Sequence, residues 1–340
     1  MLSRLRPAAL AAVLCAVAAA GGFLVTACSG GTGGGPGNGA PSLRGVSEPP
    51  GGPRIPSRGA YFGAWVRQGA YTQPDQIVAL RGLQDALGRR LDIVHTYLTW
   101  QGAFPTLSDE AALQQGSMLL VSWTGTSSAA VVSGRYDSVI RQRALQMKAI
   151  GKPVFLEWRW EMDRPNLAGL VGSPAEFIAA WKHVRAIFAE EHVNNVAWVW
   201  CPTAKGFAAG GDAAAYYPGN SQVDWICADV YPGPGPYRSF AAAAGPFLSW
   251  ASKHRKPVMI GEFGVPERYG ATLRAQWLRA AAATVQADPQ IKALVYFDAD
   301  PAGAGLGNST ALDYGTPPMQ EFRKIADSPY FNPAGLKVPG

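Results

Sequence analysis

Short apolar runs alternate with amphipathic stretches from about residue 59 to residue 335. Each run is rich in β-branched or aromatic residues, and the stretch after it carries apolar positions at helical spacing. This alternation is typical of βα units around a parallel sheet. The expected strands are Ala60–Val66, Leu91–Tyr97, Met118–Trp123, Pro153–Trp160, Val196–Cys201, Val223–Tyr231, Pro257–Phe263 and Ala293–Phe297. The expected helices are Asp75–Leu87, Tyr136–Ile150, Pro174–Glu190, Ser239–Lys253 and Thr272–Ala287.

Eight strands with helices between them predict an α/β fold, the (β/α)₈ barrel, as one domain over residues 59–335. A doubly wound open sheet is the alternative. That fold normally carries a glycine-rich phosphate turn after its first strand, and Gly63-Ala64-Trp65 does not form one. The pattern therefore favours the barrel.

The first 58 residues have a different composition. Arg4 and Arg6 precede an Ala/Val/Leu-rich run that ends in Val25-Thr26-Ala27-Cys28, the arrangement of a secretion signal. Cysteine after small residues resembles a bacterial lipobox, so we expect a signal peptide over residues 1–27 and lipidation of Cys28. A simple secretory signal or an uncleaved anchor is the alternative. Residues 28–58, rich in Gly and Pro, predict a flexible tether, which would hold an extracytoplasmic domain on the membrane without spanning it.

Composition and charge narrow the function classes. The 340 residues are 48% hydrophobic, enough for a core, and 30 Lys+Arg against 24 Asp+Glu leave a net charge of +6. This surplus is dispersed and forms no basic stripe with interleaved aromatics, which disfavours nucleic-acid binding. Cys201 and Cys227 lack histidines at metal-ligand spacing, so we expect no metal site. A disulfide between them and two buried thiols remain open alternatives, and we expect a monomer.

The carboxyl ends of barrel strands are where functional side chains gather. Glu161 and Glu262 follow the fourth and seventh strands, among many aromatic rings. A protonated and an ionised carboxyl across a barrel mouth can cleave a glycosidic bond, and flat rings suit the C–H face of a sugar. Alternatively, these residues only pack and form ion pairs. The candidate substrate-binding residues are Trp65, His95, Trp100, Trp123, Trp160, Trp200, Tyr231 and Asp298.

Four segments resemble glycoside hydrolase family 26: FLEWRWEMD, WVWCPTA, VDWICADVYPG and KPVMIGEFGVP. That family consists of retaining (β/α)₈ glycosidases and includes β-mannanases, β-1,3-1,4-glucanases and β-1,3-xylanases. The resemblance implies that Glu161 is the acid/base, that Glu262 is the nucleophile, and that Tyr231 donates a hydrogen bond to it. It also implies double displacement on a β-linked polysaccharide without a cofactor.

The chain departs from the family pattern around Glu161. Trp160 stands where many members have His, and Asp163 replaces Asn, which would raise the pKa of Glu161. Glu157 replaces an Arg, while Arg159 follows two residues later; a regular strand would pair Arg159 with Glu157 or Glu161. These departures leave the substrate open. We expect an endo-β-1,4-mannanase first, a β-1,3-1,4-glucanase or β-1,3-xylanase second, and a catalytically silent glycan-binding lipoprotein as the rival.

Overall fold

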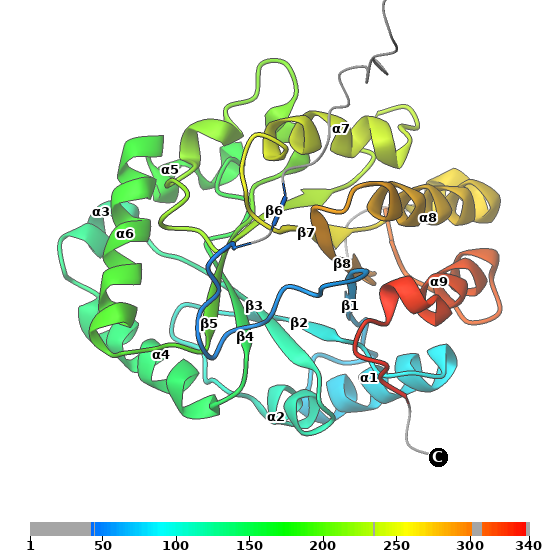
Figure 1. Ribbon diagram of the computed structural model, residues 1–340, viewed down its shortest axis with the longest axis horizontal. Helices are drawn as coiled ribbons and strands as arrows, with labels where there is room; N and C mark the ends of the chain where they lie inside the picture. The colour runs from blue at the N-terminus through cyan, green and yellow to red at the C-terminus, as the bar shows by residue number, and fades with distance from the viewer. Residues whose placement is uncertain (1–41, 44, 234, 301–307, 338–340) are drawn as a thin grey trace, which may run out of the picture. The chain divides into compact units, whose positions relative to one another are not determined.

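The strands form a closed parallel barrel in which each strand pairs with the next and β8 pairs with β1 (Figure 1). The computed structural model describes residues 42–43, 45–233, 235–300 and 308–337. The predicted barrel is confirmed, and each predicted strand end lies within two residues of the observed one. The strands are β1 Tyr61–Trp65, β2 Ile93–Leu98, β3 Met118–Trp123, β4 Val154–Trp158, β5 Val196–Trp200, β6 Trp225–Val230, β7 Val258–Phe263 and β8 Ile291–Phe297.

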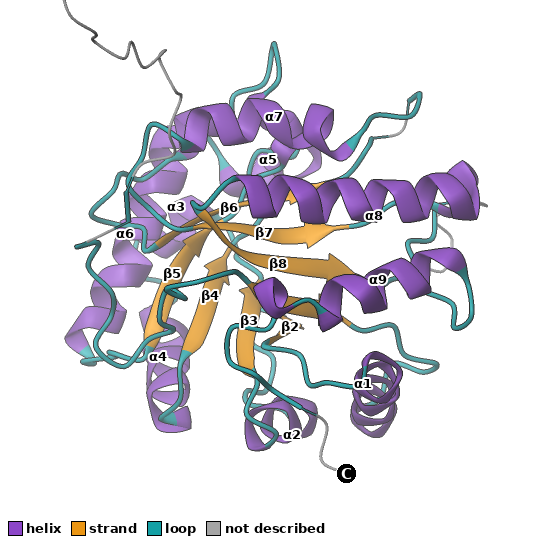
Figure 2. Ribbon diagram, turned by 45° about the vertical axis from the view of Figure 1, so that its right-hand side comes forward, coloured by secondary structure: helices purple, strands orange, loops and turns teal. Residues whose placement is uncertain are grey.

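Helices surround the outside of the barrel (Figure 2). The five predicted helices are present, again within two residues at each end, whereas α2, α3, α5 and α9 were not predicted. No helix in the described part of the chain is long and apolar enough to cross a membrane. The helices are α1 Gln73–Leu87, α2 Leu107–Gln114, α3 Ser128–Val132, α4 Asp137–Ile150, α5 Ala168–Val171, α6 Pro174–Glu190, α7 Phe240–Ala251, α8 Gly270–Ala287 and α9 Pro317–Asp327.

Local chemistry determines where the longer helices begin and end. At the start of α6, Ser173 and Glu176 form a capping box, each side chain accepting from the other's backbone N–H, and Pro174 supplies a preset φ. At the end of α4, Gly151 adopts a φ of 63°, a left-handed conformation that glycine tolerates without strain. The chain can therefore reverse directly into β4.

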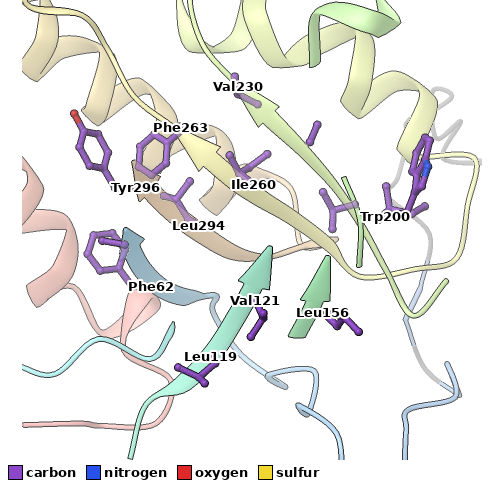
Figure 3. Close-up of a cluster of buried hydrophobic side chains, with 14 of the residues drawn as sticks. Phe62, Leu119, Val121, Leu156, Trp200, Val230, Ile260, Phe263, Leu294 and Tyr296 are labelled. Carbon is purple, nitrogen blue, oxygen red and sulfur yellow. The ribbon is translucent and has the colours of Figure 1, made fainter. Parts of the chain in front are cut away.

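Alternation along each strand divides the apolar side chains into two layers. One layer faces the helices, and Figure 3 shows part of it, including Phe62, Leu156 and Trp200. The other fills the barrel interior. Because successive strand residues point to opposite faces, the position of a residue in its strand decides which layer it joins. The interior members are Ile93, Leu120, Phe155, Ala197, Val199, Cys201, Trp225, Cys227, Met259, Ala293 and Val295.

The segment before β1 packs on the barrel, in contrast to the expected tether. Gly51 N donates to the carbonyl of Asn194 at 2.9 Å. Ile55 packs on the interior layer beside Tyr61 and Met118, which begin β1 and β3, so it covers the amino-terminal end of the barrel. Figure 1 shows this blue segment crossing the barrel. The tether therefore does not extend to residue 58; the predicted signal peptide and Cys28 lie outside the described residues.

A disulfide joins Cys201 and Cys227 inside the barrel, with a Cα–Cα distance of 4.3 Å. Of the two alternatives left open by the sequence, the structure contains the disulfide. It restricts the neighbouring strand β7: a Cβ on Gly261 would lie 2.5 Å from Cys227 Sγ and 2.9 Å from Glu157 Oε1. Only glycine fits at this position, immediately before Glu262.

Candidate active site

Glu161 lies in a turn after β4 whose backbone is held by a neighbouring strand. β4 ends at Trp158, and Arg159 and Glu161 have φ values of 54° and 49°, a left-handed conformation that is uncommon for residues other than glycine. Glu161 N donates to the carbonyl of Cys201 at 2.7 Å. Its side chain, 12% exposed, lines a hollow of about 530 Å³ on one side and one of about 150 Å³ on the other. The turn thus presents a carboxyl group to a substrate-sized hollow.

The charges around Glu161 act in opposite directions on its pKa. Burial raises it, the Arg164 guanidinium lowers it through a 2.6 Å contact, and Asp163 raises it further. Asp163 therefore raises the pKa of Glu161, as the sequence predicts, although burial raises it more. Asp163 itself is tied to the segment after β5, because its carboxylate accepts from the backbone N–H and the hydroxyl of Thr203 at 2.9 and 2.5 Å.

The predicted ion pair of Arg159 with Glu157 or Glu161 is wrong. Arg159 donates to the carbonyl of Thr126, while Glu161 pairs with Arg164. The reason is the positive φ at Arg159, which ends the regular alternation on which the prediction depended. Glu157 remains inside the barrel, 1% exposed.

Glu262 lies at the end of β7, 6% exposed, and receives two phenol hydroxyls. Tyr97 donates to its Oε1 at 2.5 Å and Tyr231 to its Oε2 at 2.7 Å. The pKa of Glu262 is raised to about 7, because burial and the charge of Glu161, which raise it, outweigh the two tyrosines and Arg164, which lower it. Tyr231 thus occupies the position that the resemblance implied. A register irregularity in β7, between Ile260 and Phe263, aims Glu262 at this site.

Aromatic rings form one wall beside Glu262. Trp65 and Trp160, both partly exposed, flank Tyr97 at centroid distances of 5.1 and 5.3 Å. Phe297 completes the wall at 6.0 Å from Tyr97. Trp65 and Trp160 therefore lie where a sugar ring could stack. Sequence reasoning did not select Tyr97 as a site residue, although its spacing from His95 places both on the inner face of β2.

Two predicted sugar-binding tryptophans, Trp123 and Trp200, are wrong, because they belong to the helix-facing layer, whereas the role of the partly exposed Trp100 stays a prediction. Trp123 is fully buried, stacks on Trp100 at 4.4 Å and donates its indole N–H to the Trp100 carbonyl. Trp200 is fully buried in the apolar cluster of Figure 3. Its ring packs against those of Tyr217 and Trp250. Their inward-facing strand neighbours are Ser122 and Cys201, so Trp123 and Trp200 point outward.

His95 and Asp298 are also wrong as substrate contacts. His95 is 1% exposed inside the barrel, and burial lowers its pKa to about 3. Asp298 is 5% exposed and accepts the backbone N–H groups of Leu312 and Arg67 at 2.8 and 3.4 Å, which ties down the chain after β8. Both side chains contact protein on all sides instead of the hollow.

Removing Trp123 should affect stability rather than substrate binding. Trp123→Ala is expected to lower the free energy of unfolding by about 3–5 kcal/mol, the usual cost of emptying a large core site. Trp160→Ala should leave stability close to that of the unmodified chain and raise KM, because this ring is partly exposed beside Glu262. Urea unfolding and steady-state kinetics on both variants measure the contrast. A Trp123→Ala variant with unchanged stability and raised KM would contradict the assignment.

Glu157, Cys201 and Cys227 place ligand atoms within 4.8 Å of one another, which is a spacing that a metal ion could bridge. The disulfide removes both thiolates, the form in which cysteine binds metal, so these residues do not fit a metal while it is intact.

Comparison with known proteins gives relatives in both sequence and structure, although no family model matches the chain. Endoglucanase H of Acetivibrio thermocellus is 28% identical over 239 residues, which are 66% of this chain and 26% of that protein. The β-1,3-xylanase TXYA of a Vibrio species is 26% identical over 145 residues, 41% of this chain and 29% of that protein. The chain therefore spans between a quarter and a third of the length of these relatives.

Solved structures share the fold. The catalytic domain of a family 26 endo-β-1,4-mannanase from Bacillus sp. JAMB-750 has a TM-score of 0.60 at 15% identity, covering 81% of this chain and 88% of that one. A β-mannanase from a symbiotic protist of the termite Reticulitermes speratus, in complex with gluco-manno-oligosaccharide, has a TM-score of 0.55 at 18% identity, covering 80% and 87%. In sequence and in fold, the chain resembles glycoside hydrolase family 26, as its motifs predict.

Proposed function

We propose that the chain is a retaining glycoside hydrolase that cleaves β-1,4-linked mannan. In the first step Glu262 attacks the anomeric carbon while Glu161 gives its proton to the leaving oxygen, so a glycosyl ester forms on Glu262. In the second step Glu161 takes a proton from water, and the water oxygen displaces Glu262. The product keeps the β configuration because the anomeric carbon is inverted twice.

The proximity of Glu262 to Glu161 carries this proposal: Glu161 and Tyr231 line the larger hollow, Tyr231 donates to Glu262, and the charge of Glu161 acts on the pKa of Glu262. Two phenol O–H groups favour the ionised Glu262 that a nucleophile requires. Burial and the charge of Asp163 favour the protonated Glu161 that an acid requires. The half-exposed Arg164 favours ionised Glu161, the state that takes up a proton in the second step.

The choice of mannan is supported by the structural neighbours, which are described as β-mannanases. A β-glucan is the second candidate, because the sequence similarity to Endoglucanase H extends over 239 residues. A β-1,3-xylan is a further alternative, from the shorter match to the Vibrio xylanase. Binding without cleavage is the outcome that would replace the enzyme proposal.

The test is reducing-sugar release by the full chain from mannan, galactomannan, barley β-glucan, β-1,3-xylan and bacterial envelope glycans. Proton NMR of the first product formed distinguishes the mechanism: a β anomer is expected, and an α anomer would overturn retention. Release from β-glucan or xylan alone would correct the substrate and keep the mechanism. Glycan binding without release, unchanged in Glu262→Ala, would make the chain a binding protein.

We also propose that Cys28 carries a lipid that anchors the enzyme outside the cell membrane. The small residues Val25-Thr26-Ala27 before Cys28 support this. Labelling cells that express the full chain with an alkyne fatty acid is expected to mark the chain, and Cys28→Ala should abolish the label. Equal labelling of both forms would contradict the lipidation site.

A further inference from the structure

A chain of polar side chains runs from the barrel interior to Glu262. Glu157 Oε2 lies 2.5 Å from Ser122 Oγ, and this oxygen lies 2.7 Å from His95 Nε2. His95 Nδ1 lies 3.4 Å from the Tyr97 hydroxyl, which donates to Glu262 at 2.5 Å. Neighbouring strands β2, β3 and β4 supply the first four residues and β7 the last. We call Glu157, Ser122, His95 and Tyr97 the relay.

Counting protons along the relay gives each contact a direction. The Tyr97 proton is committed to Glu262, so the Tyr97 oxygen can only accept from His95, which requires a proton on Nδ1. A neutral imidazole then has a bare Nε2, and Ser122 must donate to it. The Ser122 hydroxyl has only one proton, so the short contact with Glu157 needs a proton from the carboxyl group. The relay is satisfied when Glu157 is neutral and every donor points toward Glu262.

The surroundings of Glu157 agree with a neutral carboxyl group. From β2 it faces His95 Nε2 at 3.9 Å, and from β6 it faces Cys227 Sγ at 3.5 Å. When ionised, Glu262 and Glu161 raise the pKa of Glu157, and Glu157 in turn raises that of the buried Asp229 on β6. No Lys or Arg of the described residues forms an ion pair with Glu157. Burial raises the pKa of Glu157 to about 8, and burial lowers that of His95 to about 3, so the imidazole is uncharged.

We propose that Glu157, Ser122 and His95 are positioning residues that orient the Tyr97 hydroxyl toward Glu262. The inference rests on the proposed role of Glu262 as nucleophile. Hydrogen bonds that point in one direction polarise one another, so the relay strengthens the Tyr97 donation and stabilises ionised Glu262. It also explains why a carboxyl group occupies the apolar interior at position 157, where it contacts no substrate.

The tautomer of His95 tests the relay without reference to activity. In the full chain labelled with ¹⁵N-histidine, the His95 signals are assigned by their loss in His95→Gln and distinguished from those of His183, His192 and His254. The expected result at neutral pH is a neutral ring protonated at Nδ1. A ring protonated at Nε2, or at both nitrogens, would overturn the proposal even if the chain proves to be a glycosidase.

Kinetics of matched serine variants test the effect on Glu262. Ser122→Ala interrupts the relay. Ser117→Ala is the control: Ser117 lies just before β3, and its buried hydroxyl donates to the Leu91 carbonyl, outside the relay. Ser122→Ala is expected to lower kcat about tenfold, the scale of one lost hydrogen bond, with KM unchanged. The acidic limb of its kcat/KM profile should move to higher pH, because Glu262 loses stabilisation of its ionised form. Identical kinetics and pH profiles in the two variants would overturn the proposal.

Glu157→Gln tests whether a neutral donor is sufficient at this position. The amide N–H group can donate to Ser122 as the protonated carboxyl does. We expect kcat within about twofold of the unmodified chain, since the bond is retained, and an unchanged His95 tautomer. A loss as large as that of Ser122→Ala, with a changed tautomer in folded protein, would overturn the neutral role of Glu157. If the chain hydrolyses nothing, the proposed function fails and the tautomer alone decides the relay.

Discussion

Replacing Glu262 by alanine is expected to lower kcat on the substrate polysaccharide by roughly 10⁵-fold or more, the scale seen when a covalent nucleophile is removed. No other described carboxylate accepts both phenol hydroxyls, from Tyr97 and Tyr231, so no neighbour can take over its position. Initial rates of reducing-sugar release measure the loss. The exposed Glu110 on α2 offers a matched control, and Glu110→Ala should retain full activity.

Azide tests whether Glu262→Ala loses activity because the nucleophile is missing. The shortened side chain leaves space for azide, which can attack the anomeric carbon of an activated aryl β-glycoside from the face where Glu262 stood. One displacement inverts the carbon, so an α-glycosyl azide is expected as the aryloxide leaves. A Glu262→Ala variant that keeps more than a few per cent of the activity, or forms a β-azide, would contradict the assignment of Glu262.

The sequence predicted the barrel and the two glutamates because both depend on local information. Apolar runs and helical periodicity locate the strands, and the motifs around Glu161 and Glu262 place them at strand ends. The tryptophan errors are different in kind. Applying the two-residue period to β3 and β5 would have placed Trp123 and Trp200 against the helices, and applying it to β2 would have placed Tyr97 on the inner face.

Other features depend on contacts between distant segments and leave no local pattern. The turn that carries Glu161 is held by the carbonyl of Cys201, forty residues away in sequence, and its positive φ values also displace Arg159. The irregularity in β7 next to Glu262 appears in its pairing with both β6 and β8. The docking of Ile55 depends on a barrel end that only the closed fold creates. The Gly- and Pro-rich composition therefore led to the wrong prediction that the segment around Ile55 is part of a tether.

Replacing Glu161 by alanine should have an effect that depends on the leaving group. On polysaccharide, whose leaving oxygen needs a proton, kcat is expected to fall by about 10²–10⁴-fold. On an aryl β-glycoside with an acidic phenol, the first step needs no proton, whereas attack by water still lacks its base. The glycosyl ester on Glu262 should therefore accumulate, giving a burst of phenol, a low KM, and a mass increase of one glycosyl group on the intact protein.

Azide again separates a catalytic from a structural effect. In Glu161→Ala it should displace Glu262 from the accumulated α-linked ester, restore turnover and yield a β-glycosyl azide. The exposed Glu267, just after β7, provides the control variant Glu267→Ala, which should show neither burst nor rescue. Equal losses on polysaccharide and aryl glycoside, without an accumulated ester, would exclude Glu161 as acid/base. Azides of opposite configuration from Glu262→Ala and Glu161→Ala would place the two carboxyl groups on opposite faces of the sugar, a result that a purely structural role for either residue cannot produce.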